Sequence, residues 1–119
     1  PATLSRRFAM RRLAIGLAAV WALTTGCAGF RPCPDGWWGA DKAQHFAAAA
    51  LIGAGGTALA PSRLEAEEAA AAGWSAAMLA GAGKEGWDAN VRKTCWSWQD
   101  LFWDFLGASV GASAAWALE

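Results

Sequence analysis

The stretch DKAQHFAAAALIGAGGTALA, residues 41–60, decides the fold that we expect of this chain. It is dominated by Ala, which loses the least conformational freedom on entering a helix, and it contains no Pro. We predict a helix over residues 41–60, with Asp41 as its N-terminal cap and an end before Pro61 and Ser62. Val, Ile and Thr are too few to build strands.

Two further segments share this composition. A second helix is expected over residues 63–88, with three Glu residues in its first turns, where the helix dipole favours acidic side chains. Ser97-x-x-Asp100 resembles a capping box and predicts a third helix over residues 98–118. Short connections make neighbouring helices antiparallel. The sequence therefore predicts an all-α fold, a small up-down-up three-helix bundle rich in Ala and Gly, over residues 41–119.

The predicted helices match the dimensions of a membrane. Each has about 20 residues and a length near 30 Å, the hydrocarbon thickness of a bilayer. Residues 46–60 and 101–118 carry almost no charge, whereas the start of the second helix is acidic. The composition favours a membrane-associated bundle, and a bundle outside the bilayer is the alternative. Gly53, Gly107 and Gly111 would let helices pack closely in either setting.

Trp residues gather near three of the predicted helix termini. Trp favours the membrane–water interface, where its ring is half buried. The pattern predicts either an interfacial belt or a Trp-rich plug at one end of the bundle. The residues concerned are Trp37, Trp38, Trp87, Trp96, Trp98 and Trp103.

The N-terminal segment has the layout of an export signal. Four Arg residues within residues 6–12 precede an apolar run, residues 13–23, that has the length of a signal h-region. Leu23-Thr24-Thr25-Gly26-Cys27 resembles a lipobox, with Thr24 where the pattern usually has Leu. These features predict a signal-peptide helix in residues 1–26, a lipidated Cys27 and a Pro- and Gly-rich linker in residues 27–40. The alternative is an ordinary Cys in an N-terminal membrane anchor.

Lipidation of Cys27 would place the chain on the periplasmic side of a bacterial cell envelope. Ala28 follows Cys27 where Asp would favour the inner membrane of Gram-negative bacteria, so we expect an outer-membrane lipoprotein. An oxidising compartment favours a disulfide between Cys33 and Cys95, which the topology brings to one end of the bundle; two free thiols are the alternative. From Cys27 onward six basic side chains stand against ten acidic ones, a net charge of −4, so we expect no nucleic-acid partner.

Ionisable side chains form three clusters, and each contains residues four apart that share a helix face. In an up-down-up bundle the start of the first helix, the end of the second and the start of the third lie together. Buried charges are costly unless they are paired, so the clusters should contact one another. The linker from Cys27 to Asp41 spans at most about 50 Å, so this end is the membrane-proximal one. We predict one polar site made of Asp41, Lys42, His45, Lys84, Glu85, Asp88, Asp100 and Asp104.

These motifs carry a resemblance to known families. Asp-Lys-x-x-His-Phe at 41–46, Gly-Lys-Glu-x-x-Asp at 83–88 and Ser-x-x-Asp-Leu at 97–101, followed by Asp104 and Gly107, resemble the YfiM-type family of periplasmic lipoproteins. More distantly they resemble the VanZ-like membrane proteins, which usually have Asn in place of Asp104. The resemblance implies a place in the cell envelope. VanZ-like proteins are associated with tolerance of glycopeptide antibiotics, and neither family implies a settled biochemical activity.

Two non-catalytic interpretations of the polar site are open. In the first, Lys42 and Lys84 pair with the carboxylates, His45 bonds one of them, and the network sets the register of Ala-rich helices. In the second, the site binds an envelope lipid headgroup or a cell-wall precursor, with Lys42 and Lys84 on phosphate and Trp rings on the apolar part.

A third interpretation is catalytic and makes the chain a membrane-interface hydrolase. His45 would act as a general base oriented by Asp41 or Asp100, or His45 would hold a divalent metal ion together with Asp88 and Asp100. No H-E-x-x-H or paired-Cys motif supports a metal, so we assign no metal ligand and leave the cofactor open. Ser97 is explained as a helix cap rather than as a nucleophile.

Lipidation of Cys27 is directly testable. In bacteria fed radiolabelled palmitate, the wild-type chain should incorporate the label and fractionate with membranes, because the thiol of Cys27 is the expected acceptor. Cys27→Ala should remain unlabelled. Equal labelling of both proteins would contradict the lipoprotein prediction and favour a plain N-terminal anchor.

Overall fold

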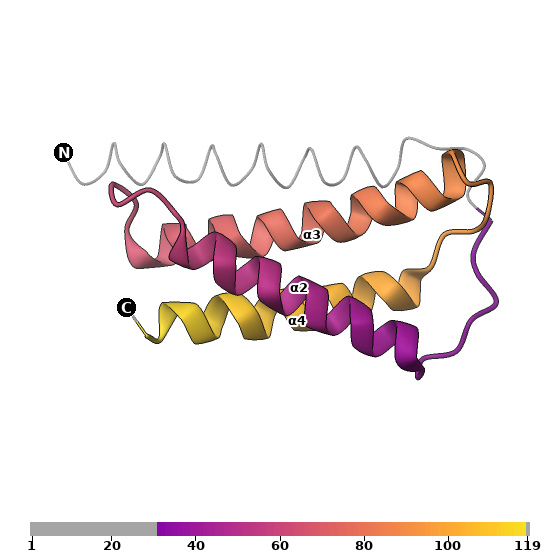
Figure 1. Ribbon diagram of the computed structural model, residues 1–119, viewed down its shortest axis with the longest axis horizontal. Coiled ribbons are helices and arrows are strands. Elements are labelled where there is room, and N and C mark those ends of the chain that lie inside the picture. The colour runs from indigo at the N-terminus through magenta and orange to yellow at the C-terminus, as the bar shows by residue number, and fades with distance from the viewer. Residues whose placement is uncertain (1–30, 119) are drawn as a thin grey trace, which may run out of the picture. The chain divides into compact units, whose positions relative to one another are not determined.

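The computed structural model describes residues 31–118, which form a three-helix bundle. The helices are α2 (Ala40–Ala58), α3 (Ala66–Asn90) and α4 (Trp98–Trp116). Figure 1 shows α3 running back along α2 and α4 running parallel to α2, which confirms the predicted all-α, up-down-up topology. The predicted signal peptide and Cys27 lie outside the described residues.

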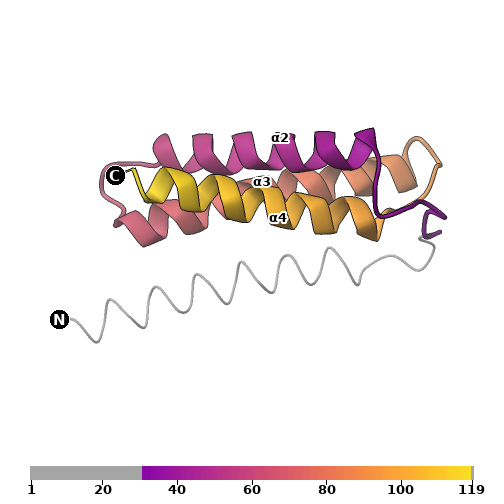
Figure 2. The same cartoon turned by 90° about the horizontal axis from the view of Figure 1, so that it is seen from below.

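The start of α2, the end of α3 and the start of α4 lie at the same end of the bundle (Figures 1 and 2). There, the disulfide between Cys33 and Cys95 joins the segment before α2 to the loop before α4, as predicted. Backbone bonds support it, since Cys33 N donates to Trp96 O at 2.8 Å and Trp96 N donates to Arg31 O at 2.8 Å. The extended chain before α2 is therefore fixed against the loop before α4.

The helix termini differ slightly from the predicted ones. Gly39, not Asp41, is the N-cap of α2, and Asp41 lies in the first turn. The helix ends at Ala58 rather than near Ala60, because a residue that precedes Pro, here Ala60, disfavours helical geometry. At the start of α4, Ser97 Oγ accepts a hydrogen bond from Asp100 N at 3.0 Å, which confirms the predicted cap.

Helix α3 begins three residues later than predicted, at Ala66 rather than Arg63, and continues to Asn90. Glu65 and Glu68 form a capping box, in which Glu65 N donates to Glu68 Oε2 at 3.3 Å. This reciprocal bonding satisfies backbone groups that the helix itself leaves without partners, and so sets where the helix starts.

The core consists of small residues, and the helices approach through glycine. Ala49, Ala77 and Ala108 are buried at its centre, one from each helix. A Cβ on Gly107 would lie 2.2 Å from the carbonyl oxygen of Phe46, and one on Gly111 would lie 2.0 Å from that of Ala50. The predicted close packing at these glycines is confirmed, and α2 and α4 pack backbone against backbone.

Most large apolar side chains lie outside this core, and Trp96 and Leu101 are the buried exceptions. Leu51 is 75% exposed, and Leu59, Phe105 and Val110 are also exposed. Because Ala and Gly fill the interfaces, little room is left inside for a larger side chain. Within residues 31–118, no helix combines the length and the apolar character that crossing a membrane requires.

The close packing gives a matched pair of variants. Gly111→Ala should lower the free energy of unfolding by about 1–3 kcal/mol, because the new methyl meets the backbone of Ala50. Gly83→Ala, whose Cβ meets nothing within 4 Å, should raise it by about 0.5–1 kcal/mol through helix propensity. Urea unfolding followed by Trp fluorescence measures both. A Gly111→Ala protein as stable as the wild type would mean that α2 and α4 do not pack this closely.

Candidate functional site

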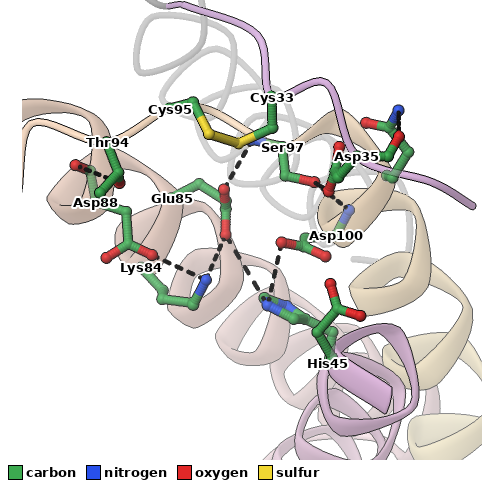
Figure 3. Close-up of a disulfide and its surroundings, with 12 residues drawn as sticks. Cys33, Asp35, His45, Lys84, Glu85, Asp88, Thr94, Cys95, Ser97 and Asp100 are labelled. Atoms are coloured by element: carbon green, nitrogen blue, oxygen red, sulfur yellow. Dashed lines mark hydrogen bonds and ion pairs between the residues drawn. A yellow bond between two sulfur atoms is a disulfide. The ribbon is translucent and has the colours of Figure 1, made fainter. Parts of the chain in front are cut away.

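The three clusters of ionisable residues meet at the disulfide-bonded end of the bundle (Figure 3). Hydrogen bonds and ion pairs link all eight of the predicted site residues into one network, so the predicted contiguous site is present. The partners within it differ in part from those that the sequence suggested.

Lys42 is the buried centre of the network, with only 2% of the residue exposed. Its Nζ donates to Asp35 Oδ2 at 2.5 Å, Asp41 Oδ2 at 2.8 Å and Asp100 Oδ1 at 2.6 Å. Burial alone would lower the pKa of Lys42, but its hydrogen bonds to these carboxylates raise the pKa well above its ordinary value. Lys42 is therefore an ammonium ion that is fully occupied by protein groups.

Asp35 is a member of the site that sequence reasoning missed. Its Oδ2 accepts from Ser97 Oγ at 2.7 Å as well as from Lys42, and Gln99 Nε2 donates to its carbonyl oxygen at 3.1 Å. Partial burial tends to raise the pKa of Asp35, and the bonds from Lys42 and Ser97 outweigh this and lower it. The available signal was its position two residues after Cys33, because the disulfide holds that segment against α4.

His45 is held between carboxylates from α3 and α4. Its Nδ1 lies 2.9 Å from Asp104 Oδ1, and its Nε2 lies 3.5 Å from Asp100 Oδ2 and 4.0 Å from Glu85 Oε1. The hydrogen bond with Asp104 is the main cause of a raised pKa at His45. The expected orientation of His45 by its helix neighbour Asp41 is wrong, because Asp41 bonds Lys42 and Asp104 takes that role.

Glu85 and Asp88 have different roles although they lie on the same helix. Glu85 is 1% exposed, and its Oε2 accepts from Ser97 N at 2.9 Å, while its Oε1 accepts from Lys84 Nζ at 2.8 Å. Asp88 instead pairs with Lys84 at 3.0 Å and Arg92 at 3.1 Å, and the bond from Lys84 is the main cause of its lowered pKa. The predicted set of His45, Asp88 and Asp100 is thus corrected, since Glu85 stands beside His45 in place of Asp88 (Figure 3).

Lys84 differs from Lys42 in its access to solvent. Its side chain is 49% exposed and pairs with Glu85 and Asp88. Partial burial would lower the pKa of Lys84, and its hydrogen bonds to these two carboxylates raise it. Of the two lysines in the site, Lys84 is therefore the one whose ammonium an incoming molecule can reach.

A pocket of about 270 Å³ lies between α2 and α3. His45, Lys84 and Asp104 line it at the end nearest the polar network, together with Gln44. Toward the middle of the bundle its lining is apolar and includes Ala48, Ala49, Ile52, Ala77 and Ala80. The pocket therefore offers a charged end and an apolar wall to one molecule.

Comparisons with protein-family models, curated proteins and solved structures found no match to this chain. The resemblance of its motifs to YfiM-type and VanZ-like proteins stays a prediction. The function is therefore inferred from the geometry and chemistry of the site.

The burial of Lys42 predicts a large effect on stability. Lys42→Met should lower the free energy of unfolding by about 3–5 kcal/mol, because it leaves three carboxylates without their shared cation. Lys84→Met should cost less than about 1 kcal/mol, because that ammonium is half exposed.

A double-mutant cycle tests whether the effect of Lys42→Met comes from its direct bond to Asp100. The double variant Lys42→Met, Asp100→Asn should cost less than the two single variants added together, as measured by urea unfolding. Strict additivity would contradict a direct Lys42–Asp100 interaction.

Proposed function

We propose that this chain is a cell-envelope lipoprotein whose bundle binds an envelope lipid or lipid-linked cell-wall precursor at the membrane surface. The observation that carries the proposal is the pocket between α2 and α3, which is charged at one end and apolar along the rest. Amphiphilic ligands need these two surfaces side by side, because the headgroup requires polar partners and the acyl chain requires apolar ones.

At the charged end, Lys84 is the group suited to a phosphate. Its side chain is half exposed, whereas both ring nitrogens of His45 face carboxylates. Lys42 does not fit the phosphate-binding role considered from the sequence, since three carboxylates occupy its ammonium. Its role is to hold the network together.

The surface around this end supports contact with a membrane. Trp38 is 83% exposed, and Trp37, Trp98 and Phe102 are each about half exposed. Trp37 packs edge-on against Phe102 with ring centroids 5.4 Å apart, which joins the segment before α2 to α4. Trp rings favour the membrane–water interface, and Cys27 precedes Arg31 by only four residues, a span of at most about 14 Å.

A hydrolase that acts on the same amphiphile is the second candidate. The observation that favours it is the bond between His45 Nδ1 and the buried carboxylate of Asp104. A carboxylate in this position fixes the orientation of an imidazole that works as a general base.

Decyl phosphate is a suitable probe for calorimetric titration below its micelle concentration. The wild-type protein should bind it, and inorganic phosphate should bind much more weakly. Ala48→Phe, which fills the pocket from α2, should weaken binding by about tenfold or more. Ala47→Phe adds the same ring at an exposed position outside the pocket and should bind like the wild type.

The outcomes separate the candidates. Equal binding by the two Phe variants, or no binding by the wild type, would contradict the proposed pocket and favour a purely structural network. Release of inorganic phosphate during the titration, abolished in His45→Asn, would favour the hydrolase.

A further inference from the structure

Two groups of three acidic or imidazole side chains in the network are compact enough to surround a cation. In the first, oxygens of Asp35, Asp41 and Asp100 lie within 4.8 Å of one another, and the ammonium of Lys42 fills the space between them. In the second, ligand atoms of His45, Glu85 and Asp100 lie equally close. Two ammonium groups adjoin this second group without occupying its centre, Lys42 at Asp100 Oδ1 and Lys84 at Glu85 Oε1.

The distances in the second group suit a metal ion better than hydrogen bonds. His45 Nε2 lies 3.5 Å from Asp100 Oδ2 and 4.0 Å from Glu85 Oε1, both longer than a normal N–H···O bond. Ligands about 2.1 Å from a common ion lie roughly 3–4 Å from one another. The three atoms thus have the spacing of one coordination shell.

Asp104 supplies an independent indication. Its Oδ1 accepts from His45 Nδ1, which is the arrangement that directs the opposite ring nitrogen toward a metal. Its Oδ2 has no hydrogen-bond partner among the described residues, although Asp104 is only 2% exposed. A buried carboxylate oxygen without a donor indicates that the network lacks positive charge.

The charges of the whole network lead to the same conclusion. Six carboxylates stand against the three permanent cations Lys42, Lys84 and Arg92. With a neutral His45, which metal ligation requires, a divalent ion would offset most of the remaining negative charge. His45 also lines the pocket between α2 and α3, which gives an ion a route to the site.

We propose that His45 Nε2, Glu85 Oε1 and Asp100 Oδ2 bind a divalent first-row transition-metal ion, with Asp104 orienting His45. One imidazole with carboxylates is a ligand set for ions such as Zn²⁺ or Mn²⁺. Binding replaces the proton on Nε2, which is released to solvent. This site does not depend on lipid binding. If both occur, the ion adds positive charge near the pocket end assigned to the phosphate.

Mn²⁺ gives a direct readout of the proposed ligands. Full-length oxidised protein, stripped with a chelator, should bind Mn²⁺ with an electron spin-echo spectrum that contains coupling to an imidazole nitrogen. His45→Gln should lose that coupling. Glu85→Gln should weaken Mn²⁺ and Zn²⁺ binding about tenfold or more, and Glu67→Gln, the same change at an exposed position of the same helix outside the network, should leave affinity unchanged.

Each outcome decides the proposal. A wild-type protein that binds neither ion, or that binds Mn²⁺ without nitrogen coupling, would overturn it. Equal weakening by Glu85→Gln and Glu67→Gln would also overturn it and indicate loose attraction to surface acids. If Glu85→Gln does not fold, the wild-type nitrogen coupling and its loss in His45→Gln decide. All titrations omit lipid, so failure here is distinct from failure of the decyl phosphate experiment.

Discussion

The buried ammonium of Lys42 is the interaction on which the rest of the site depends. Its three carboxylate partners come from the segment before α2, from α2 itself and from α4. Taking this charge out of water is costly, and the cost is offset only when all partners are in place. The ion cluster therefore requires one arrangement of these three parts of the chain, and it rejects alternatives that the apolar contacts would tolerate.

Such a constraint matters because the small apolar side chains of the core do little to fix how the helices are placed. Ala49, Ala77 and Ala108 bury little area each, so a shift of one helix along another changes their contacts only slightly. The glycines of α4 favour the register in which no Cβ meets the backbone of Phe46 or Ala50, but they do not position the segment before α2. The disulfide closes a loop across a sequence separation of 62 residues, which contributes about 3–4 kcal/mol, and it acts at the same end as Lys42. Polar and covalent contacts thus supply the specificity that small apolar side chains do not.

The same composition explains what could be predicted from the sequence and what could not. The Ala-rich segments and the helix-breaking residues between them predict three helices. Antiparallel packing of these helices then brings Cys33 to Cys95 and brings the charged clusters together. The rotation of each helix about its own axis does not follow, because an Ala- and Gly-rich helix has no clearly larger apolar face. Glu85 and Asp88 lie three positions apart, yet Glu85 is buried beside His45 while Asp88 turns to Lys84 and Arg92. The place of Asp35 in the site could not be predicted, because a segment with Pro and Gly has no periodicity that would indicate where its side chains point.

Asp100 joins the structural part of the site to the part that faces the pocket. Its Oδ1 accepts from the ammonium of Lys42, and its Oδ2 lies 3.5 Å from His45 Nε2. The carboxylate cannot rotate toward one partner without losing the other, so Lys42 fixes the position of the oxygen that faces His45.

Glu85 is constrained in a comparable way, since one oxygen accepts from the backbone of Ser97 and the other faces Lys84 and His45. Each of these two carboxylates is held by a structural contact through one oxygen and faces the same imidazole nitrogen with the other. Preorganised groups of this kind can bind a cation without first losing their own conformational freedom. The ion cluster around Lys42 therefore also fixes the position of the Asp100 carboxylate beside His45.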